Sequence, residues 1–391
     1  MKFVGSPLFV FLVIVFIGST LLIDRGADFE RTTDNAPQNQ GATSSTPLLA
    51  ATTTVVTSAT TTTATSTSKK TIVVPKKISA KATEIATSTP AKNPDAATRI
   101  QNPYPFPAGS FTTINEKARG ALVNILCTPR EGGLLPTSGS GVIIDPRGVI
   151  LTNAHVAQYV LLSESRDIDL SCVIRVGSPA VSKWHAVVIY IPTVWVKEHV
   201  SEIKSQQAFG TGEHDYALLL ITNSVDGQTY TTYPSLSVDT RQAIGFEGDP
   251  VLVASYPAEL AGGFTAQNGL YAASSQTTIQ KLLTFVVQTV DLISLGGVIE
   301  AQSGSSGGAV VNAWGRLIGL IATTSAGGTT GDRDLHALTL SYIDRDLASQ
   351  TGHNLTEILN SNVTSLATDF TQNAALGLIQ KYIDTLTGHT Q

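Results

Sequence analysis

The sequence predicts an all-β domain, either a barrel or a sandwich, placed after a long polar spacer. Three observations support this fold class. Repeated apolar runs of strand length follow residue 110, and Gly, Pro, Asp and Ser separate them. Long helical patterns do not alternate with these runs, as they would in a parallel α/β sheet. The composition, with 42% hydrophobic and 14% charged residues, provides enough apolar side chains for a sizeable core.

The domain is expected to span residues 109–345. Thr113 and Glu116 form a capping-box pattern, which predicts a short helix at its start. The strand-length runs then fall into two series. The first series comprises residues 121–127, 141–144, 149–153, 172–176, 186–191 and 216–221. The second series comprises residues 251–255, 282–290, 309–312, 317–322 and 335–342.

The amino-terminal segment 1–30 is expected to be a membrane anchor. Residues 3–23 form an almost uninterrupted apolar run, long enough as a helix to cross a bilayer core of roughly 30 Å. Lys2 precedes the run and acidic residues follow it, which favours a cytoplasmic amino end and an extracytoplasmic remainder. A cleaved signal peptide is the alternative, but its apolar region is shorter and an A-x-A site would follow.

Residues 31–108 are dominated by Thr, Ser, Ala and Pro, with almost no aromatic residues before Tyr104. Such a segment buries too little apolar surface to order itself. We therefore expect a disordered spacer that holds the domain away from the membrane; a role in binding the cell wall is the alternative.

Residues 346–391 show apolar spacings near the helical period, for example at Leu355, Ile358 and Leu359 and again at Leu366 and Phe370. Two helices are expected in this carboxy-terminal extension. The simplest role for them is to cover one end of the β domain, and binding a partner is the alternative.

Charge and cysteine content exclude several classes of function. The net charge is −5 and no basic stripe is present, so nucleic acid is not an expected partner. Cys127 and Cys172 are the only cysteines, too few for a zinc site, and neither lies in a C-x-x-C pair. They form either one disulfide or two buried thiols. No metal or cofactor is expected, and the oligomeric state is left open.

The glycine-rich run G-S-S-G-G at 304–308 is the first candidate for chemistry. Its glycines let the backbone turn tightly, which brings the amides of Gly304 and Ser306 to one point where they can bind an oxyanion. Ser306 would then be a nucleophile. A plain loop is the alternative for this run taken alone.

His155 and Asp215 are the partners that Ser306 needs. His155 follows the hairpin formed by 138–144 and 149–153, whose turn Asp145-Pro-Arg-Gly is read as type I. An imidazole can accept the serine proton and return it to a leaving amine. Asp215 stands just before the apolar run 216–221, where a carboxylate can orient the imidazole. His214 is a competing base.

These segments, in the order His, Asp, Ser, resemble the chymotrypsin-type serine peptidases, and among them the bacterial Deg/HtrA group. The similarity covers residues 113–342. It is carried by S-G-S-G at 138–141, T-N-A-H-V at 152–156, H-D-Y-A-L-L-L at 214–220, G-D-P-V at 248–251 and G-S-S-G-G at 304–308. The resemblance implies two six-stranded β-barrels with the triad between them. It also implies a serine endopeptidase that cleaves proteins or peptides through an acyl-enzyme, with protein quality control as its biological role.

Two departures from the family are visible. No PDZ module with its carboxylate-binding loop is recognised after the barrels, and the I-V-G-G start of trypsin-type zymogens is absent. A catalytically silent binding or sensor module on the same fold is the alternative function.

Substrate preference is expected to depend on Glu300 or on a second set of residues. Glu300 stands six residues before Ser306, the position at the base of the specificity pocket in trypsin-like relatives, where an acid selects Arg or Lys. The Deg/HtrA group usually accepts small aliphatic residues instead. In that case the pocket would lie among residues 321–325 and His336.

Overall fold

The computed structural model describes residues 99–388, apart from 101, 131–133, 206–210, 260–265, 286–287, 326–328 and 330. All of these residues belong to one compact unit of the chain. The expected anchor at 1–30 and most of the expected spacer lie outside the described residues. Within the described residues, no helix combines the length and the apolar character that crossing a bilayer requires.

The domain begins with helix α1 (Phe111–Ala121), which passes directly into strand β1. Its N-cap is Ser110, whose hydroxyl accepts the Thr113 N–H at 3.2 Å. Serine is among the favoured N-cap residues because its oxygen satisfies an otherwise unpaired amide. The helix therefore starts three residues earlier than the pattern at Thr113 and Glu116 predicted.

The first sheet is a closed six-stranded barrel with the order β1-β2-β3-β6-β5-β4. Its strands are β1 (Leu122–Pro129), β2 (Thr137–Asp145), β3 (Val149–Thr152), β4 (Leu170–Val176), β5 (Val181–Tyr190) and β6 (Ala217–Ser224). Helix α2 (Ala154–Ser163) contacts β1, β2, β4, β5 and β6, and nearly all of its side chains are buried. It thus fills one end of the barrel, beside α3 (Thr193–His199) and the 3₁₀ turn η1 (Val200–Glu202).

The second sheet differs from the six-stranded barrel that the resemblance implied. It has seven strands in the order β8-β7-β11-β12-β13-β10-β9, and among the described residues it is open, with β8 and β9 at its edges. The short 3₁₀ turn η2 (Gln242–Ile244) precedes it. The strands are β7 (Pro250–Ser255), β8 (Ala273–Thr278), β9 (Lys281–Leu283), β10 (Leu292–Ser294), β11 (Ala309–Asn312), β12 (Leu317–Thr324) and β13 (Leu335–Thr339).

Two local features explain why the sequence did not predict this sheet completely. Among the described residues of the expected strand at 282–290, only 282–283 are in a strand, β9, and β10, which pairs with β9, begins beyond the expected range at Leu292. Strand β8 consists of A-S-S-Q-T-T and is half-exposed at the sheet edge, so it carries no apolar pattern. Edge strands of this kind are visible only through their backbone pairing.

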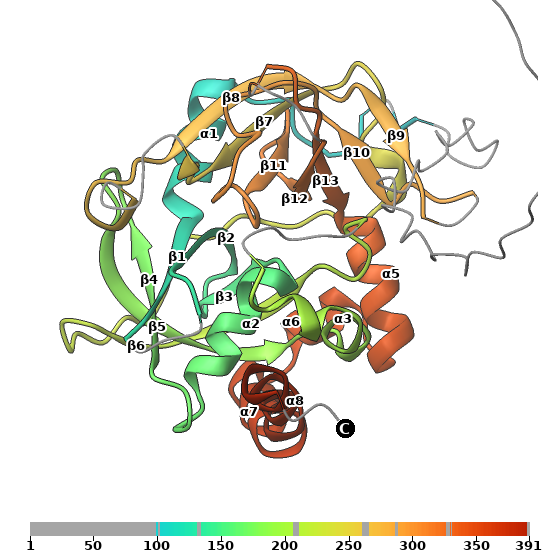
Figure 1. Cartoon of the computed structure of the whole chain (residues 1–391). Helices are drawn as coiled ribbons and strands as arrows, with labels where there is room; N and C mark the ends of the chain where they lie inside the picture. Colours follow the sequence, from blue (N-terminus) through green and yellow to red (C-terminus); the bar gives the residue numbers. More distant parts are fainter. Residues whose placement is uncertain are drawn as a thin grey trace, which may run out of the picture. The chain divides into compact units, whose positions relative to one another are not determined.

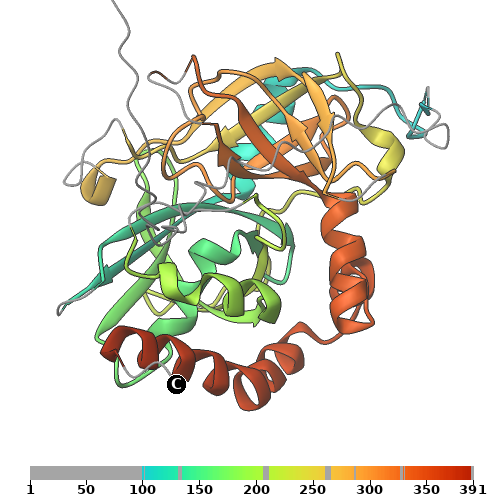
Figure 2. The same cartoon turned by 45° about the vertical axis from the view of Figure 1, so that its right-hand side comes forward.

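The chain ends in helices that run from the second sheet back to the first barrel, as the orange to dark red helices in Figures 1 and 2 show. Helix α5 (Leu340–Thr351) starts immediately after β13, with Thr339 as its N-cap, so the strand expected at 335–342 is shorter. It packs on β12 and β13. Then follow α6 (Leu355–Asn360), α7 (Val363–Phe370), the π-turn η4 (Thr371–Ala375) and α8 (Leu376–Thr387). Helix α7 packs on β5 and β6, and α8 on α2 and η1.

The segment before α1 also belongs to the folded domain. Tyr104 donates a hydrogen bond to Asp239, and the guanidinium groups of Arg241 and Arg316 lie over its ring. Burial, followed by the bond to Asp239, raises the pKa of Tyr104 to about 12. Arg99 pairs with Asp249. Composition had assigned these residues to the spacer, but they contact the second sheet and its preceding loop.

The two cysteines lie opposite each other on neighbouring strands. Cys127 of β1 faces Cys172 of β4 in the register, and the two form a disulfide. The sequence had left a bridge and two free thiols open. The pairing of β1 with β4, which closes the barrel, decides in favour of the bridge.

Candidate active site

His155 and Asp215 meet at one end of the first barrel. Antiparallel pairing of β3 with β6 sets Thr152 opposite Ala217, so the residues just after β3 and just before β6 lie side by side. The Asp215 carboxylate is 2.7 Å from Nδ1 of His155. Asn153 reinforces this arrangement by donating its side-chain amide to the Asp215 carbonyl at 2.7 Å.

Asp215 also caps helix α2. The second carboxylate oxygen accepts the backbone N–H of His155 at 3.0 Å, in the first turn of the helix. The N-cap residue Asn153 makes no capping bond of its own. A carboxylate is favoured at this helix end because the first amides are unpaired and the helix dipole is positive there.

The contact between Asp215 and His155 determines which ring nitrogen carries the proton. An ionised carboxylate only accepts hydrogen bonds, so Nδ1 of His155 donates and Nε2 keeps its lone pair. The His155 side chain retains 15% of its surface exposed, against 7% for Asp215. A partly accessible imidazole with a basic Nε2 is the form that accepts a proton from a nucleophile.

Ser306 lies on a tight loop just before β11. The flanking glycines, Gly304 and Gly307, have φ of 91° and 86°, a region that favours glycine. A Cβ at Gly307 would lie 2.0 Å from the carbonyl oxygen of Ser140 and 2.6 Å from the Thr152 hydroxyl. The loop is therefore pressed against the end of β3, three residues before His155.

The amides of Gly304 and Ser306 are the donors that the sequence predicted for an oxyanion site. Among the residues that the structure describes, neither the Gly304 N–H nor the Ser306 N–H has a hydrogen-bond acceptor. The neighbouring amides are satisfied, since Gly307 donates to Ile321 and Gly308 to Ser305. Two free donors beside a serine are what stabilisation of a tetrahedral oxyanion requires.

Ser140 joins the two halves of the site. Its backbone N–H donates to the Ser306 carbonyl at 2.7 Å, and its buried hydroxyl donates to the Gly304 carbonyl at 2.8 Å. The same hydroxyl accepts the Tyr256 N–H at 2.9 Å. A residue of the first barrel thus holds both ends of the Gly304–Ser306 turn.

The structure brings Asp215 and His155 into direct contact and sets the Ser306 loop beside them. Within the described part of the chain, no hydrogen bond joins the Ser306 hydroxyl to the His155 ring. Such bonds are often long before a substrate binds and shorten in the reactive complex.

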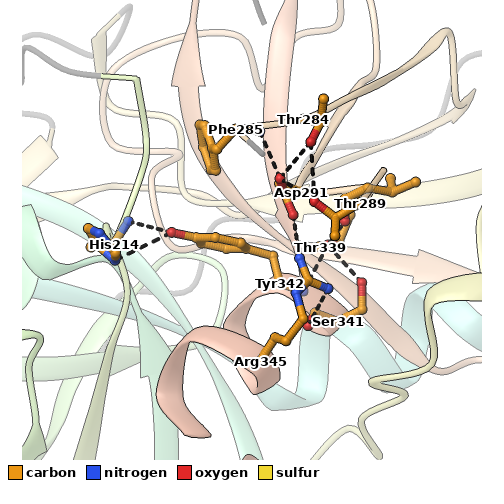
Figure 3. A network of polar contacts seen from close by, with 10 residues as sticks. His214, Thr284, Phe285, Thr289, Asp291, Thr339, Ser341, Tyr342 and Arg345 are labelled. Carbon is orange, nitrogen blue, oxygen red and sulfur yellow. Dashed lines mark hydrogen bonds and ion pairs between the residues drawn. The ribbon is translucent and has the colours of Figure 1, made fainter. Parts of the chain in front are cut away.

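The contacts of His214 argue against it as the general base. Its Nδ1 lies 3.0 Å from the Asp346 carboxylate on α5, and its backbone N–H donates to the Tyr342 hydroxyl at 2.9 Å. Figure 3 shows this contact between His214 and Tyr342. The hydrogen bond to Asp346 raises the pKa of His214, which favours the protonated ring. A protonated imidazole cannot accept a proton.

Helix α5 therefore holds the loop that carries Asp215. The Asp346 carboxylate accepts from His214 and from the Tyr216 hydroxyl at 2.9 Å, on either side of Asp215. The preceding residue of the helix, Arg345, pairs with the buried Asp291 just before β10 of the second sheet, a contact also seen in Figure 3.

The two candidates for the specificity pocket occupy different environments. Glu300 is completely buried, with one oxygen accepting from Ser275 at 3.1 Å and the other, Oε2, without a partner among the described residues. Burial raises the pKa of Glu300. His336 is 14% exposed and its Nε2 lies 3.2 Å from Asp334. A substrate side chain would reach Glu300 only if the covering residues move.

Sequence reasoning did not single out Ser140 or Asn153. Both lie inside recognised motifs, S-G-S-G and T-N-A-H-V, so the signal was present at the level of the motif. Their hydrogen-bond partners are distant in sequence, so the motifs alone do not indicate which contacts these two residues make. The described residues contain no cluster of three or more His, Cys, Asp or Glu side chains suited to a metal ion.

Part of the chain is similar to known proteins. Residues 139–320 match the family described as "Trypsin-like peptidase domain", a span that includes His155, Asp215 and Ser306. No curated protein sequence matches the chain. Among solved structures, the crystal structure of Deg5 aligns with a TM-score of 0.41 and 15% identity, over 62% of this chain and 94% of that chain. Residues 139–320 are therefore a trypsin-like peptidase domain, and the two β-sheets, one of them a closed six-stranded barrel, are consistent with the chymotrypsin fold.

Proposed function

We propose that the protein is a serine endopeptidase in which Ser306 is the nucleophile, His155 the general base and Asp215 the residue that orients it. The observation that carries the proposal is the 2.7 Å contact between Asp215 and His155, beside two amides of the Ser306 loop that have no acceptor among the described residues. In a non-catalytic protein, N–H groups at such a tight turn would be expected to have hydrogen-bond acceptors.

The chemistry follows from these positions. His155 Nε2 takes the hydroxyl proton as Ser306 Oγ attacks the scissile carbonyl, and the N–H groups of Gly304 and Ser306 bind the resulting oxyanion. The imidazolium then gives its proton to the departing amine, which leaves an acyl ester on Ser306. Water, activated by the same imidazole, hydrolyses the ester and restores the hydroxyl.

Labelling with an alkyl fluorophosphonate tests the proposal, because the reagent needs an activated serine. We expect one label per chain, located at Ser306 by mass spectrometry. Ser306→Ala should remove the label and lower turnover of a casein substrate by about four to six orders of magnitude. Ser305→Ala is the neighbouring control and should still be labelled at Ser306. A wild-type protein that folds but takes no label would instead favour the silent binding or sensor module.

The site is proposed to work outside the cytoplasm, tethered by the apolar segment 3–23. Two observations support this location: the length of that apolar run and the Cys127–Cys172 disulfide, since such bonds persist in oxidising compartments. Protein quality control is the role that the resemblance to the Deg/HtrA group suggests.

Selection of a basic side chain by Glu300 is proposed as one of two specificities. The buried Oε2 has no partner among the described residues, and an incoming Arg or Lys would provide one and favour the ionised form of the carboxyl group. Cleavage after Arg or Lys should then exceed cleavage after Val or Leu on a peptide library, and Glu300→Gln should reverse the ratio. An unchanged ratio would assign the pocket to residues 321–325 and His336.

A further inference from the structure

The segment that follows β7 holds the two peptide groups on either side of the Ser303 Cα, Gln302–Ser303 and Ser303–Gly304. The Ser303 carbonyl accepts the backbone N–H of Ala258 at 2.8 Å and that of Glu259 at 3.3 Å. The Ser303 N–H, in turn, donates to the Glu259 carboxylate at 3.2 Å. Two consecutive residues, Ala258 and Glu259, therefore satisfy both backbone polar groups of Ser303.

These bonds decide which way the Gly304 N–H points. In a trans peptide the carbonyl and the following N–H lie on opposite sides of the bond. With the Ser303 carbonyl directed at Ala258, the Gly304 N–H must face the other way, and it has no acceptor among the described residues. A rotated peptide would replace this donor with a carbonyl oxygen, which repels an oxyanion.

Arg333 holds the Glu259 carboxylate in place. Its two terminal nitrogens donate to the two Glu259 oxygens at 2.7 and 2.9 Å, the bidentate geometry that guanidinium and carboxylate groups favour. One of these nitrogens also donates to the Ala301 carbonyl at 3.1 Å, on the same loop as Ser306. The pairing with Arg333 lowers the pKa of Glu259, so the carboxylate stays charged.

We propose that Glu259 and Arg333 are positioning residues that fix the backbone of Ser303 through its N–H, and thereby keep the adjoining Ser303–Gly304 peptide in the orientation needed for the oxyanion site. The inference rests on the proposed function of Ser306, because only a catalytic serine needs that amide in one orientation. The two residues act through the backbone and contact no reacting atom. They come from separate loops, after β7 and before β13, so this contact makes the state of the site depend on both loops.

The rate at which a fluorophosphonate labels Ser306 in the full-length protein measures this effect without a known substrate. Removing one oxyanion donor typically costs about 10²- to 10³-fold. Because the two residues only bias the peptide, we expect Glu259→Ala and Arg333→Ala to slow labelling about 10-fold or more. Glu259→Gln should be intermediate, since its amide oxygen can still accept from Ser303 but carries no charge for Arg333.

A charge exchange separates positioning from stabilisation. The double variant Glu259→Arg with Arg333→Glu restores opposite charges, but arginine has no acceptor for the Ser303 N–H. We expect it to recover the thermal unfolding temperature while labelling stays slow. Asp226→Asn is the matched control, because it breaks a comparably exposed ion pair with Lys183 on the first barrel. This control should leave the labelling rate within about 2-fold of wild type.

The outcomes distinguish this inference from the proposed function. If wild type is labelled and the labelling rate of Glu259→Ala lies within about 2-fold of it, the inference alone is overturned. The same holds if the charge-exchange variant is labelled at the full wild-type rate. A wild type that takes no label overturns the proposed function and the inference with it. If Glu259→Ala shows no cooperative unfolding transition, Glu259→Gln decides, and an unchanged rate in that variant rejects the inference.

Discussion

Asp215 performs two structural tasks with one carboxylate. One oxygen accepts the His155 N–H and so caps the amino-terminal end of helix α2, while the other accepts from Nδ1 of the same residue. The position of the imidazole is therefore fixed relative to both the helix and the acid. Glu300 differs from Asp215. It is buried, one of its oxygens accepts only from Ser275, and the other has no partner among the described residues. A carboxylate in that position favours its neutral form.

Replacing Glu300 should change how stability depends on pH. Burial raises the pKa of Glu300 in the folded state. The folded protein then binds a proton that the unfolded chain has lost, so the stability present below the ordinary glutamate pKa is lost as pH rises through the raised value. We expect wild type to lose more unfolding free energy between about pH 4 and pH 8 than Glu300→Gln does.

Urea unfolding at both pH values measures this difference. Glu247→Gln, at an exposed position, is the control and should leave the pH dependence unchanged. Parallel pH profiles for wild type and Glu300→Gln would show that Glu300 is ionised in the folded protein.

At the scale of elements, helix α5 joins the two sheets at the site. Its residue Asp346 binds His214 and Tyr216 just before β6 of the first barrel, and Arg345 binds Asp291 just before β10 of the second sheet. Asp291 is itself buried and accepts from the Thr284 hydroxyl and the Phe285 N–H. The helix therefore connects the loop that carries Asp215 to the interior of the opposite sheet.

Asp346→Ala should loosen the Asp215 loop from one side. The substitution removes the acceptor shared by three side chains, those of His214, Tyr216 and Gln350. His214 and Tyr216 are the residues directly before and after Asp215. We expect a loss of about 1–3 kcal/mol in unfolding free energy, as for other unpaired buried groups. Because Asp215 still reaches His155, kcat should fall by about 10-fold, far less than for Ser306→Ala.

Steady-state kinetics and urea unfolding of the same samples test this expectation. Asp369→Asn, an exposed change on α7, should alter neither quantity. A variant that loses stability but keeps wild-type kcat would show that α5 supports the fold without positioning Asp215.

At the scale of the whole molecule, the folded domain extends further toward the amino terminus than composition indicated. Tyr104 lies among Phe106, Trp314, Asp239 and Arg241, and aromatic and charged contacts hold it against the second sheet. The arginine bonds and the bond from Tyr104 outweigh the effect of burial and lower the pKa of Asp239. This segment passes over the sheet before α1 begins.

Two shortened chains measure its contribution. A chain starting at Arg99 keeps all of these contacts, whereas a chain starting at Gly109 loses them. We expect the fluorophosphonate to label Ser306 in both chains. The unfolding free energy of the shorter chain should be lower by about 1–3 kcal/mol, which is the contribution of one buried aromatic cluster and its hydrogen bond. Equal midpoints would mean that the segment rests on the sheet without stabilising it.

The sequence by itself determined the all-β class, most of the strands and the three segments that hold Ser306, His155 and Asp215. These depend on local features, namely apolar runs, turn residues and the glycines around Ser306, which a linear pattern preserves. Only the tertiary structure decided that the second sheet has seven strands and is open among the described residues, that Cys127 bonds Cys172, and that Asp215 caps α2. It also decided that Arg333 and Glu259 hold the Ser303 peptide. The reason is that each of these contacts joins residues that lie far apart in the chain, and their hydrogen bonds leave no periodic trace in composition or spacing.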